Sequence, residues 1–255
     1  MTIFLRFLLT LVVLTPATAL ATHPLQVEDT GTEGKGNYLF EITGDYLKDN
    51  DIKATQVTGV VTAGAGKHTD LSIEAPYLML DPSPALGGYT SGHGDVRLKL
   101  KHRLFNNEVR QSMAYLLFID LPTGDVEKGL GTNNVVWGGR LIDSQACGDY
   151  VFHANLGYET FGRDVKRWHF AENYAITFGL AAERGVTDSL RFLAELAGES
   201  RKEPKEATPY SRPFTVLAGL IYDVSKSWYV DLGARAGLNK YAEDYSVLAG
   251  TAWRF

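Results

Sequence analysis

Cysteine is almost absent from this chain, which holds only one, Cys147, among 255 residues. A single cysteine forms no internal disulfide, and it excludes a cysteine-rich zinc or iron–sulfur site. Positive charge is also scarce, because 25 Lys and Arg stand against 30 Asp and Glu, for a formal net charge of −5. A mildly acidic chain lacks the basic surface that binds phosphate backbones, so we expect no nucleic acid partner.

Long hydrophobic runs are missing beyond the first residues. The longest, Met113 to Ile119, has seven residues, whereas a membrane-spanning helix needs about 20. This excludes an α-helical membrane protein. At the start of the chain, the apolar run Phe7 to Leu14 follows Arg6 and precedes the small-residue site Ala19 to Ala21. That is the pattern of a cleaved signal peptide, so we expect residues 1–21 to be removed and the protein to be exported.

The rest of the chain is rich in alternation between apolar and polar residues. From Trp228 to Leu238 every second residue is apolar, and Asp231 and Arg235 fall in the intervening set. A period of two is typical of a β-strand whose two faces meet different surroundings. The segment from 95 to 104 alternates in the same way and places four cations at every second position: Arg97, Lys99, Lys101 and Arg103.

Twelve segments of this kind follow one another along the chain. An even number of antiparallel strands with alternating faces is what a closed outer-membrane barrel requires. We therefore predict an all-β fold for residues 37–255: a closed, transmembrane, antiparallel β-barrel of about 12 strands, of the outer-membrane type. The predicted strands lie near residues 37–48, 53–64, 69–80, 93–104, 108–121, 133–143, 149–160, 167–182, 189–200, 212–224, 227–239 and 244–255.

The links between the predicted strands alternate between short and long. This is typical of membrane barrels, which have short periplasmic turns and longer external loops. The short links are Asn106-Asn107, Cys147-Gly148, Gly185 to Asp188 and Ser225-Lys226, and the long ones are Asp81 to Gly92, Pro122 to Thr132 and Arg201 to Ser211.

The last strand ends on an aromatic residue. Trp253 and Phe255 close an alternating segment, and this resembles the terminal strand of outer-membrane barrels, which the barrel-assembly machinery recognises. We predict Trp253 and Phe255 as the assembly signal, and the assembly machinery and outer-membrane lipid as partners.

The polar faces of the strands then line the lumen. We expect these residues to form the path of a small-molecule substrate, and the predicted lumen set is Arg97, Lys99, Lys101, Arg103, Arg140, Arg191, Glu195, Asp231, Arg235 and Arg254. Cations at every second position repel one another unless acids or water lie opposite them. One interpretation is a basic ladder that selects anions; the other, which we favour, is a network of ion pairs that fills a narrow barrel.

Three details complete the predicted barrel. The polar, Gly-rich segment at 22–36 either plugs the lumen or remains in the periplasm as a flexible leader. Pro76 lies inside a predicted strand, where it removes a hydrogen-bond donor, so we expect a bulge around it. The predicted girdle of aromatic residues at the membrane interfaces comprises Tyr38, Tyr46, Trp168, Trp228, Tyr229, Tyr245 and Trp253.

An outer-membrane enzyme and a soluble periplasmic barrel are the two alternatives to a channel. An outer-membrane enzyme needs an activated nucleophile, but none of the six histidines lies in a metal-binding H-E-x-x-H motif, and no G-x-S-x-G elbow is present. We therefore expect no catalytic residue, no metal and no cofactor. A soluble periplasmic barrel that binds a ligand would need a dry interior, which the cations at 97–103 disfavour unless they face water.

Several stretches of the mature chain resemble a proteobacterial transporter family, labelled as the putative MetA pathway of phenol degradation. They are His23 to Asn37 (HPLQVEDTGTEGKGN), Asp70 to Tyr77 (DLSIEAPY), Gly94 to Lys101 (GDVRLKLK), Leu121 to Gly131 (LPTGDVEKGLG), Ala154 to Tyr158 (ANLGY) and the closing TAWRF. The resemblance implies passage of small, often aromatic, molecules across the outer membrane. With no ATP-binding motif evident, we expect passive passage along a gradient.

The terminal signal leads to a first prediction. Deleting Phe255 lowers the yield of assembled barrel, because the assembly machinery no longer meets the terminal aromatic residue. The assembled fraction is measured in outer membranes as the band whose mobility on an SDS gel changes on boiling. A normal yield without Phe255 would contradict the assignment.

Overall fold

A computed structural model describes residues 23–83, 86–107, 111–160, 174–202 and 213–255. The predicted signal peptide, Trp168 and much of the predicted long link at 201–211 lie outside these residues. Within them, no helix is long and apolar enough to cross a membrane.

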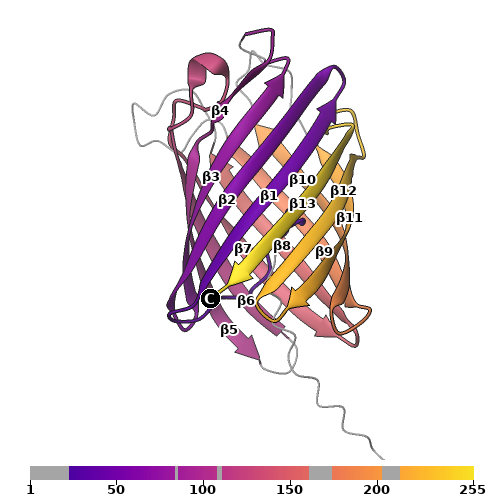
Figure 1. Ribbon diagram of the computed structural model, residues 1–255. Helices are drawn as coiled ribbons and strands as arrows, with labels where there is room; N and C mark the ends of the chain where they lie inside the picture. The colour runs from indigo at the N-terminus through magenta and orange to yellow at the C-terminus, as the bar shows by residue number, and fades with distance from the viewer. Residues whose placement is uncertain (1–22, 84–85, 108–110, 161–173, 203–212) are drawn as a thin grey trace, which may run out of the picture.

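The described chain is built almost entirely from long antiparallel strands (Figure 1). Their boundaries agree with the predicted segments to within a few residues, apart from those segments that run into undescribed residues. The elements are β1 (Tyr38–Asp49), β2 (Ile52–Gly66), β3 (Thr69–Asp81), β4 (Thr90–His93), β5 (Val96–Asn107), β6 (Gln111–Leu121), the 3₁₀ turn η1 (Val126–Lys128), β7 (Val136–Cys147), β8 (Tyr150–Thr160), β9 (Tyr174–Gly185), β10 (Leu190–Lys202), β11 (Phe214–Ser225), β12 (Trp228–Gly237) and β13 (Tyr245–Arg254).

Twelve of these strands close into a ring, which confirms the predicted barrel. Each strand pairs with the next one along the chain, and β1 pairs with β13 to join the two ends of the sheet. The seam continues past the last strand, because the Phe255 N–H donates to the Tyr38 carbonyl at 2.9 Å and the Tyr38 N–H donates to the Phe255 carbonyl at 3.1 Å. The short β4 is additional and pairs only with β3. Closure leaves no unpaired edge for lipid to meet.

Pro76 does not create the predicted bulge. Its register with β2 runs unbroken, with Thr58 opposite Pro76. On its other side, β3 pairs with β5 as far as Glu74 and with β4 from Tyr77 onward. The Pro76 carbonyl points to that side, where it accepts a hydrogen bond from the Gly94 N–H at 2.9 Å. The side of Pro76 that lacks an N–H therefore faces the gap between the two partner strands, β5 and β4. No hydrogen bond of the sheet is lost there.

The observed bulges lie elsewhere. Register shifts occur at Gly64/Gly66, Arg103/Phe105 and Asp223/Ser225. All three lie at the end of the barrel where the short links are, which we call the turn end; the opposite end is the loop end (Figure 1). By the rule for outer-membrane barrels, the turn end faces the periplasm. Bulges are common at barrel rims because they allow the strand to bend there.

The two faces of the sheet differ as the alternation predicts. Outward-facing side chains are large and apolar, such as Leu156 (57% exposed), Leu180 (61%) and Leu232 (51%). The inward-facing set contains Glu195, Asp231 and Arg235, which are buried inside the barrel. An apolar outer band with a polar interior is the arrangement of transmembrane barrels.

One member of the predicted aromatic girdle faces the other way. Tyr229 is 3% exposed, and its hydroxyl donates to Glu41 at 3.1 Å. It shares the inward face with Asp231 because the two are separated by two positions. The girdle assignment of Tyr229 is therefore wrong. Trp228 and Trp253 do lie on the outer face, stacked with ring centroids 6.2 Å apart.

The direction of the faces leads to a second prediction. Leu232→Arg places a charge in lipid near the middle of β12, and it should lower the free energy of unfolding by about 2–4 kcal/mol. Gln56→Arg is the matched control, because Gln56 lines the lumen and an added cation there remains in water. Both are measured by urea titration in lipid vesicles, with the heat-dependent gel shift as readout. Equal stability of the two variants would contradict the assignment of faces.

Candidate functional site

The lumen is crossed by the chain itself. Residues 23–36, which we call the lumen segment, lie inside the barrel before the chain enters β1. At its start, His23 Nδ1 lies 2.5 Å from the Asp231 carboxylate of β12. Further on, one Glu195 oxygen of β10 accepts the N–H groups of Gln26 and Val27 at 2.7 and 2.8 Å. The segment therefore contacts strands from the second half of the barrel first.

The segment then reaches the opposite wall and returns to β1. Asn155 of β8 binds both backbone groups of Glu28, accepting its N–H at 2.7 Å and donating to its carbonyl at 2.8 Å. The Thr30 N–H donates to Ser144 of β7 at 3.2 Å. The segment ends beside β2, where the Gly36 N–H donates to the Gly64 carbonyl at 2.9 Å. Up to that point, the wall groups that hold its backbone are side chains.

Charge complementarity accompanies these backbone contacts. Glu28 lies between Lys99 and Lys101 of β5, with each nitrogen 3.3 Å from a carboxylate oxygen. Lys101 also lies 3.2 Å from Asp29. Near the turn end, Glu33 lies 3.4 Å from Arg254. Three acids of the segment thus neutralise cations of the barrel wall.

The two glutamates differ in how their surroundings affect ionisation. Burial alone would raise the pKa of Glu28, but Lys99, Lys101 and Arg140 lower that pKa to about 2. Burial raises the pKa of Glu33, and nearby Asp70 adds to this rise while Arg254 opposes it. Because the pKa of Glu28 lies below its ordinary value, its ion pairs with Lys99 and Lys101 persist through mildly acidic conditions.

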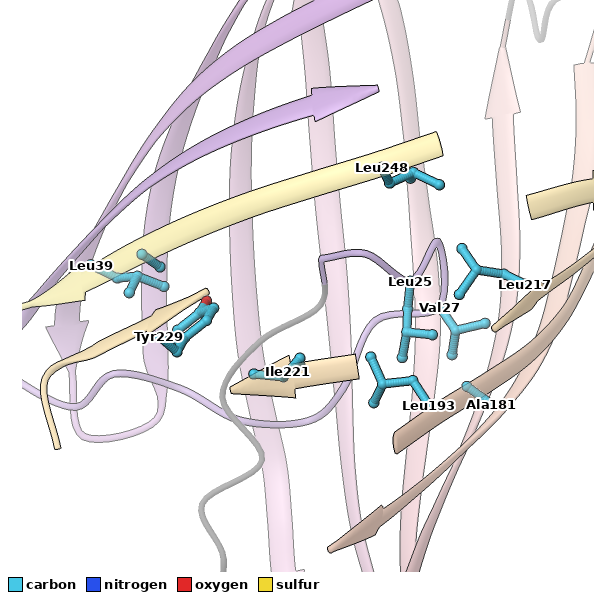
Figure 2. Packing of buried hydrophobic residues seen from close by; sticks show 10 residues of the cluster. Leu25, Val27, Leu39, Ala181, Leu193, Leu217, Ile221, Tyr229 and Leu248 are labelled. Atoms are coloured by element: carbon cyan, nitrogen blue, oxygen red, sulfur yellow. The ribbon is translucent and has the colours of Figure 1, made fainter. Parts of the chain in front are cut away.

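Apolar side chains also hold the segment in place. Leu25 and Val27 are buried against side chains of β9, β10 and β11 (Figure 2). Burial of these apolar side chains stabilises the segment against this part of the wall. The residues of these strands in the same cluster are Ala181, Leu193, Leu217 and Ile221.

Glycines of the wall make room for the segment. A Cβ at Gly179 would lie 2.4 Å from a Val27 methyl carbon, and one at Gly233 would lie 2.9 Å from Pro24. A Cβ at Gly64 would lie 1.7 Å from the Gly34 carbonyl oxygen. Because real Cβ atoms do not approach other atoms so closely, glycine at these three positions is what allows the segment to fit against the wall.

The segment separates two cavities that share no lining residue. The larger, of about 670 Å³, lies on the loop side and has His23 to Val27 among its lining residues. The smaller, of about 50 Å³, is lined by Glu28, Glu33 and Lys101 among others. We call the larger cavity the vestibule. Its volume lies in the range of cavities that bind small organic ligands.

The remaining predicted lumen residues line the wall around this segment, and the predicted basic ladder is paired along its length. Arg97 forms a bidentate pair with Asp120 at 2.6 and 2.8 Å, and Arg103 lies 3.1 Å from His68 Nδ1. Arg191 lies 3.2 Å from Glu183. Arg235 pairs with Asp45 at 3.1 Å and with Glu243. Arg140 differs from Arg97, Arg191 and Arg235, because among the described residues its hydrogen-bond partner is a neutral backbone group of the lumen segment, the Gln26 carbonyl at 3.0 Å.

The structure also brings together residues that the sequence did not single out as a group. Ser144 Oγ lies 2.8 Å from His153 Nδ1, and His153 Nε2 lies 3.2 Å from Glu183. These types occur in nucleophilic catalysis, but all three side chains are buried, and none lines either cavity above. The group therefore forms a hydrogen-bond network of the wall. Only the pairing of β7, β8 and β9 reveals it.

The residues predicted as the assembly signal lie at the seam. Trp253 faces outward and stacks on Phe40 of β1 with ring centroids 6.0 Å apart. Phe255 is 76% exposed and continues the backbone pairing with Tyr38.

The sequence matches a known protein family over most of its length. Residues 29–255 match the family described as "Putative MetA-pathway of phenol degradation". The chain belongs to this family. No curated protein matches the sequence.

Solved structures similar to this member of the phenol-degradation family are outer-membrane barrels. An outer-membrane channel from Pseudomonas putida F1 has a TM-score of 0.72 at 14% identity, covering 89% of this chain and 98% of the channel. The NanC porin has a TM-score of 0.59 at 10% identity, covering 84% and 98%. The translocator domain of the autotransporter NalP from Neisseria meningitidis has a TM-score of 0.51 at 12% identity, covering 89% and 91%. At these identities the likeness shows the fold.

The glycine contacts lead to a third prediction. Gly179→Val displaces Val27 and with it the lumen segment, because the new side chain occupies the space of the Val27 methyl group. We expect a higher ion conductance in planar bilayers than that of the unmodified protein. Gly59→Val is the control, because a Cβ at Gly59 meets nothing within 4 Å. Unchanged conductance in a folded Gly179→Val barrel would contradict this role of Gly179.

Proposed function

We propose that this protein is an outer-membrane channel for passive passage of small molecules, and that the lumen segment closes it in the conformation described above. The barrel supplies a polar lumen that crosses the membrane. The vestibule supplies an entry chamber of about 670 Å³ on the loop side. The lumen segment lies between this chamber and the turn end.

The observation that carries the proposal is how the lumen segment is attached. From His23 to Glu33 it takes part in no strand pairing, and wall side chains hold it at Asp231, Glu195, Asn155 and Ser144. Such contacts can be exchanged for water and ligand without breaking a ladder bond of the barrel. A closed ring of strands with a separately attached segment is therefore suited to opening while the wall remains intact.

Export and membrane assembly belong to the same proposal. The pattern of residues 1–21 supports cleavage after Ala21, which would leave His23 close to the new N-terminus. The exposure of Phe255 at the seam supports its proposed recognition by the assembly machinery. Outer-membrane lipid is then the partner of the apolar outer face.

Small organic molecules, aromatic or anionic, are the proposed substrates. The size of the vestibule fits such molecules, and the similar protein from Pseudomonas putida is itself an outer-membrane channel. An enzyme is the less favoured alternative, because the Ser144–His153–Glu183 group reaches neither cavity.

Removing the lumen segment tests this function. A variant lacking residues 23–34 should fold, insert and conduct ions at a level well above that of the full chain, because the centre of the lumen then holds water. Folding is checked by the heat-dependent gel shift of protein from outer membranes, and conductance is measured in planar bilayers. A folded, truncated barrel that conducts no more than the full chain would overturn the proposal. Soluble, periplasmic full-length protein would overturn it as well.

A further inference from the structure

The Glu28 side chain is bound in the lumen as a ligand would be. Lys99 Nζ lies 3.3 Å from Oε1 and Lys101 Nζ lies 3.3 Å from Oε2, so each oxygen has its own cation. Asn155 binds both backbone groups of the same residue. Protein sites that bind carboxylates commonly provide a charged hydrogen-bond donor for each of the two oxygens.

The cations belong to the wall, whereas the carboxylate belongs to the lumen segment. Leu116 of β6 is in register with Lys101 of β5 on one side and with Arg140 of β7 on the other. The two cations therefore lie in the same cross-strand row of the wall, on the two strands that flank β6. Beyond Arg140 in the same row lies Gly157, where a Cβ would come within 2.9 Å of the Arg140 side chain. The glycine therefore gives Arg140 room to project into the lumen.

Departure of the lumen segment would affect these cations unequally. Lys99 keeps an ion pair with Glu74 at 2.5 Å. Both acids paired with Lys101, Glu28 and Asp29, leave with the segment. Asp70, its cross-strand neighbour, remains. Arg140 loses its hydrogen bond to Gln26. A lumen cation that has lost its partner favours entry of another anion.

The position of Arg140 makes the site accessible from the vestibule. Arg140 and Asn155 line the vestibule, whereas Lys99 and Lys101 line the small cavity beyond the segment. An anion that enters from the loop end thus reaches Arg140 before it reaches the lysines. The planar guanidinium has five N–H donors, and among the described residues it donates to the Gln26 carbonyl, so other donors remain for a carboxylate.

We propose that Lys99, Lys101 and Arg140 form a binding site for small organic carboxylates, which Glu28 fills as an internal ligand while the channel is closed. The inference rests on the proposed channel function and names its substrate class. Because the incoming carboxylate and Glu28 compete for the same cations, substrate binding favours departure of the lumen segment. The lumen segment is in this sense a substitute for the substrate.

Benzoate and benzyl alcohol provide a matched pair of probes, since they share the ring and differ in the carboxylate. Binding is measured by calorimetric titration of the folded barrel in detergent, which does not depend on conduction. The variant lacking residues 23–34 should bind benzoate at least about tenfold more tightly than the full chain, and it should not bind benzyl alcohol. Lys101→Gln in the truncated barrel should weaken benzoate binding by a similar factor. Lys128→Gln, on the 3₁₀ turn η1 outside the lumen, is the control.

A second variant covers the case in which the truncated barrel does not fold. Glu28→Gln keeps the full chain and the shape of the side chain but removes the competing carboxylate, so it should also bind benzoate more tightly than the unmodified protein. Equal binding of both probes, or benzoate binding that Lys101→Gln leaves unchanged, would overturn the carboxylate site.

The outcomes of the two proposals remain separate. A truncated barrel that conducts but does not bind benzoate would overturn only the carboxylate site. A truncated barrel that binds benzoate in detergent but fails to conduct in bilayers would overturn the channel function and leave the binding site standing.

Discussion

Hydrogen bonding between β1 and β13 is the interaction on which the rest of the structure depends. Before this seam forms, the sheet has two open edges, and in lipid each unpaired backbone group costs several kcal/mol. The ten register pairs from Leu39–Arg254 to Lys48–Tyr245 remove that cost. The seam joins the first strand of the barrel to the last, so closure requires the whole chain between them to be in place.

Closure creates an interior, and the interior imposes a second requirement. Lumen-facing cations such as Lys101 and acids such as Asp231 are largely removed from bulk water and need partners. The lumen segment supplies them, with Glu28 and Asp29 for Lys101 and with His23 for Asp231. A segment that neutralises the wall in this way is stable inside the barrel without belonging to its ladder. The same contacts that keep it in place would serve an anion that replaces it.

Much of the barrel could be predicted from the sequence, because the alternation of polar and apolar residues along a single strand reflects what each of its two faces contacts. Leu232 and Asp231 are adjacent, and their opposite character follows from one strand that faces lipid on one side and the lumen on the other. Two details differ from the expectation. Pro76 needs no bulge, because the side on which it lacks an N–H falls between β5 and β4. Tyr229 faces inward with Asp231, two positions away on β12, and Glu41 of β1 accepts the hydrogen bond of its hydroxyl.

The sequence by itself determined the all-β class, the twelve-strand barrel, the polar face of each strand and the family. Only the tertiary structure decided where residues 23–36 lie and which cations Glu28 binds. The physical reason is that the lumen segment has no periodic pattern of its own, and its partners are far away in the chain: Lys99, Asn155, Glu195 and Asp231. Those side chains come together only when the ring closes. Which of them meet depends on the register between strands, and no short stretch of the sequence contains that information.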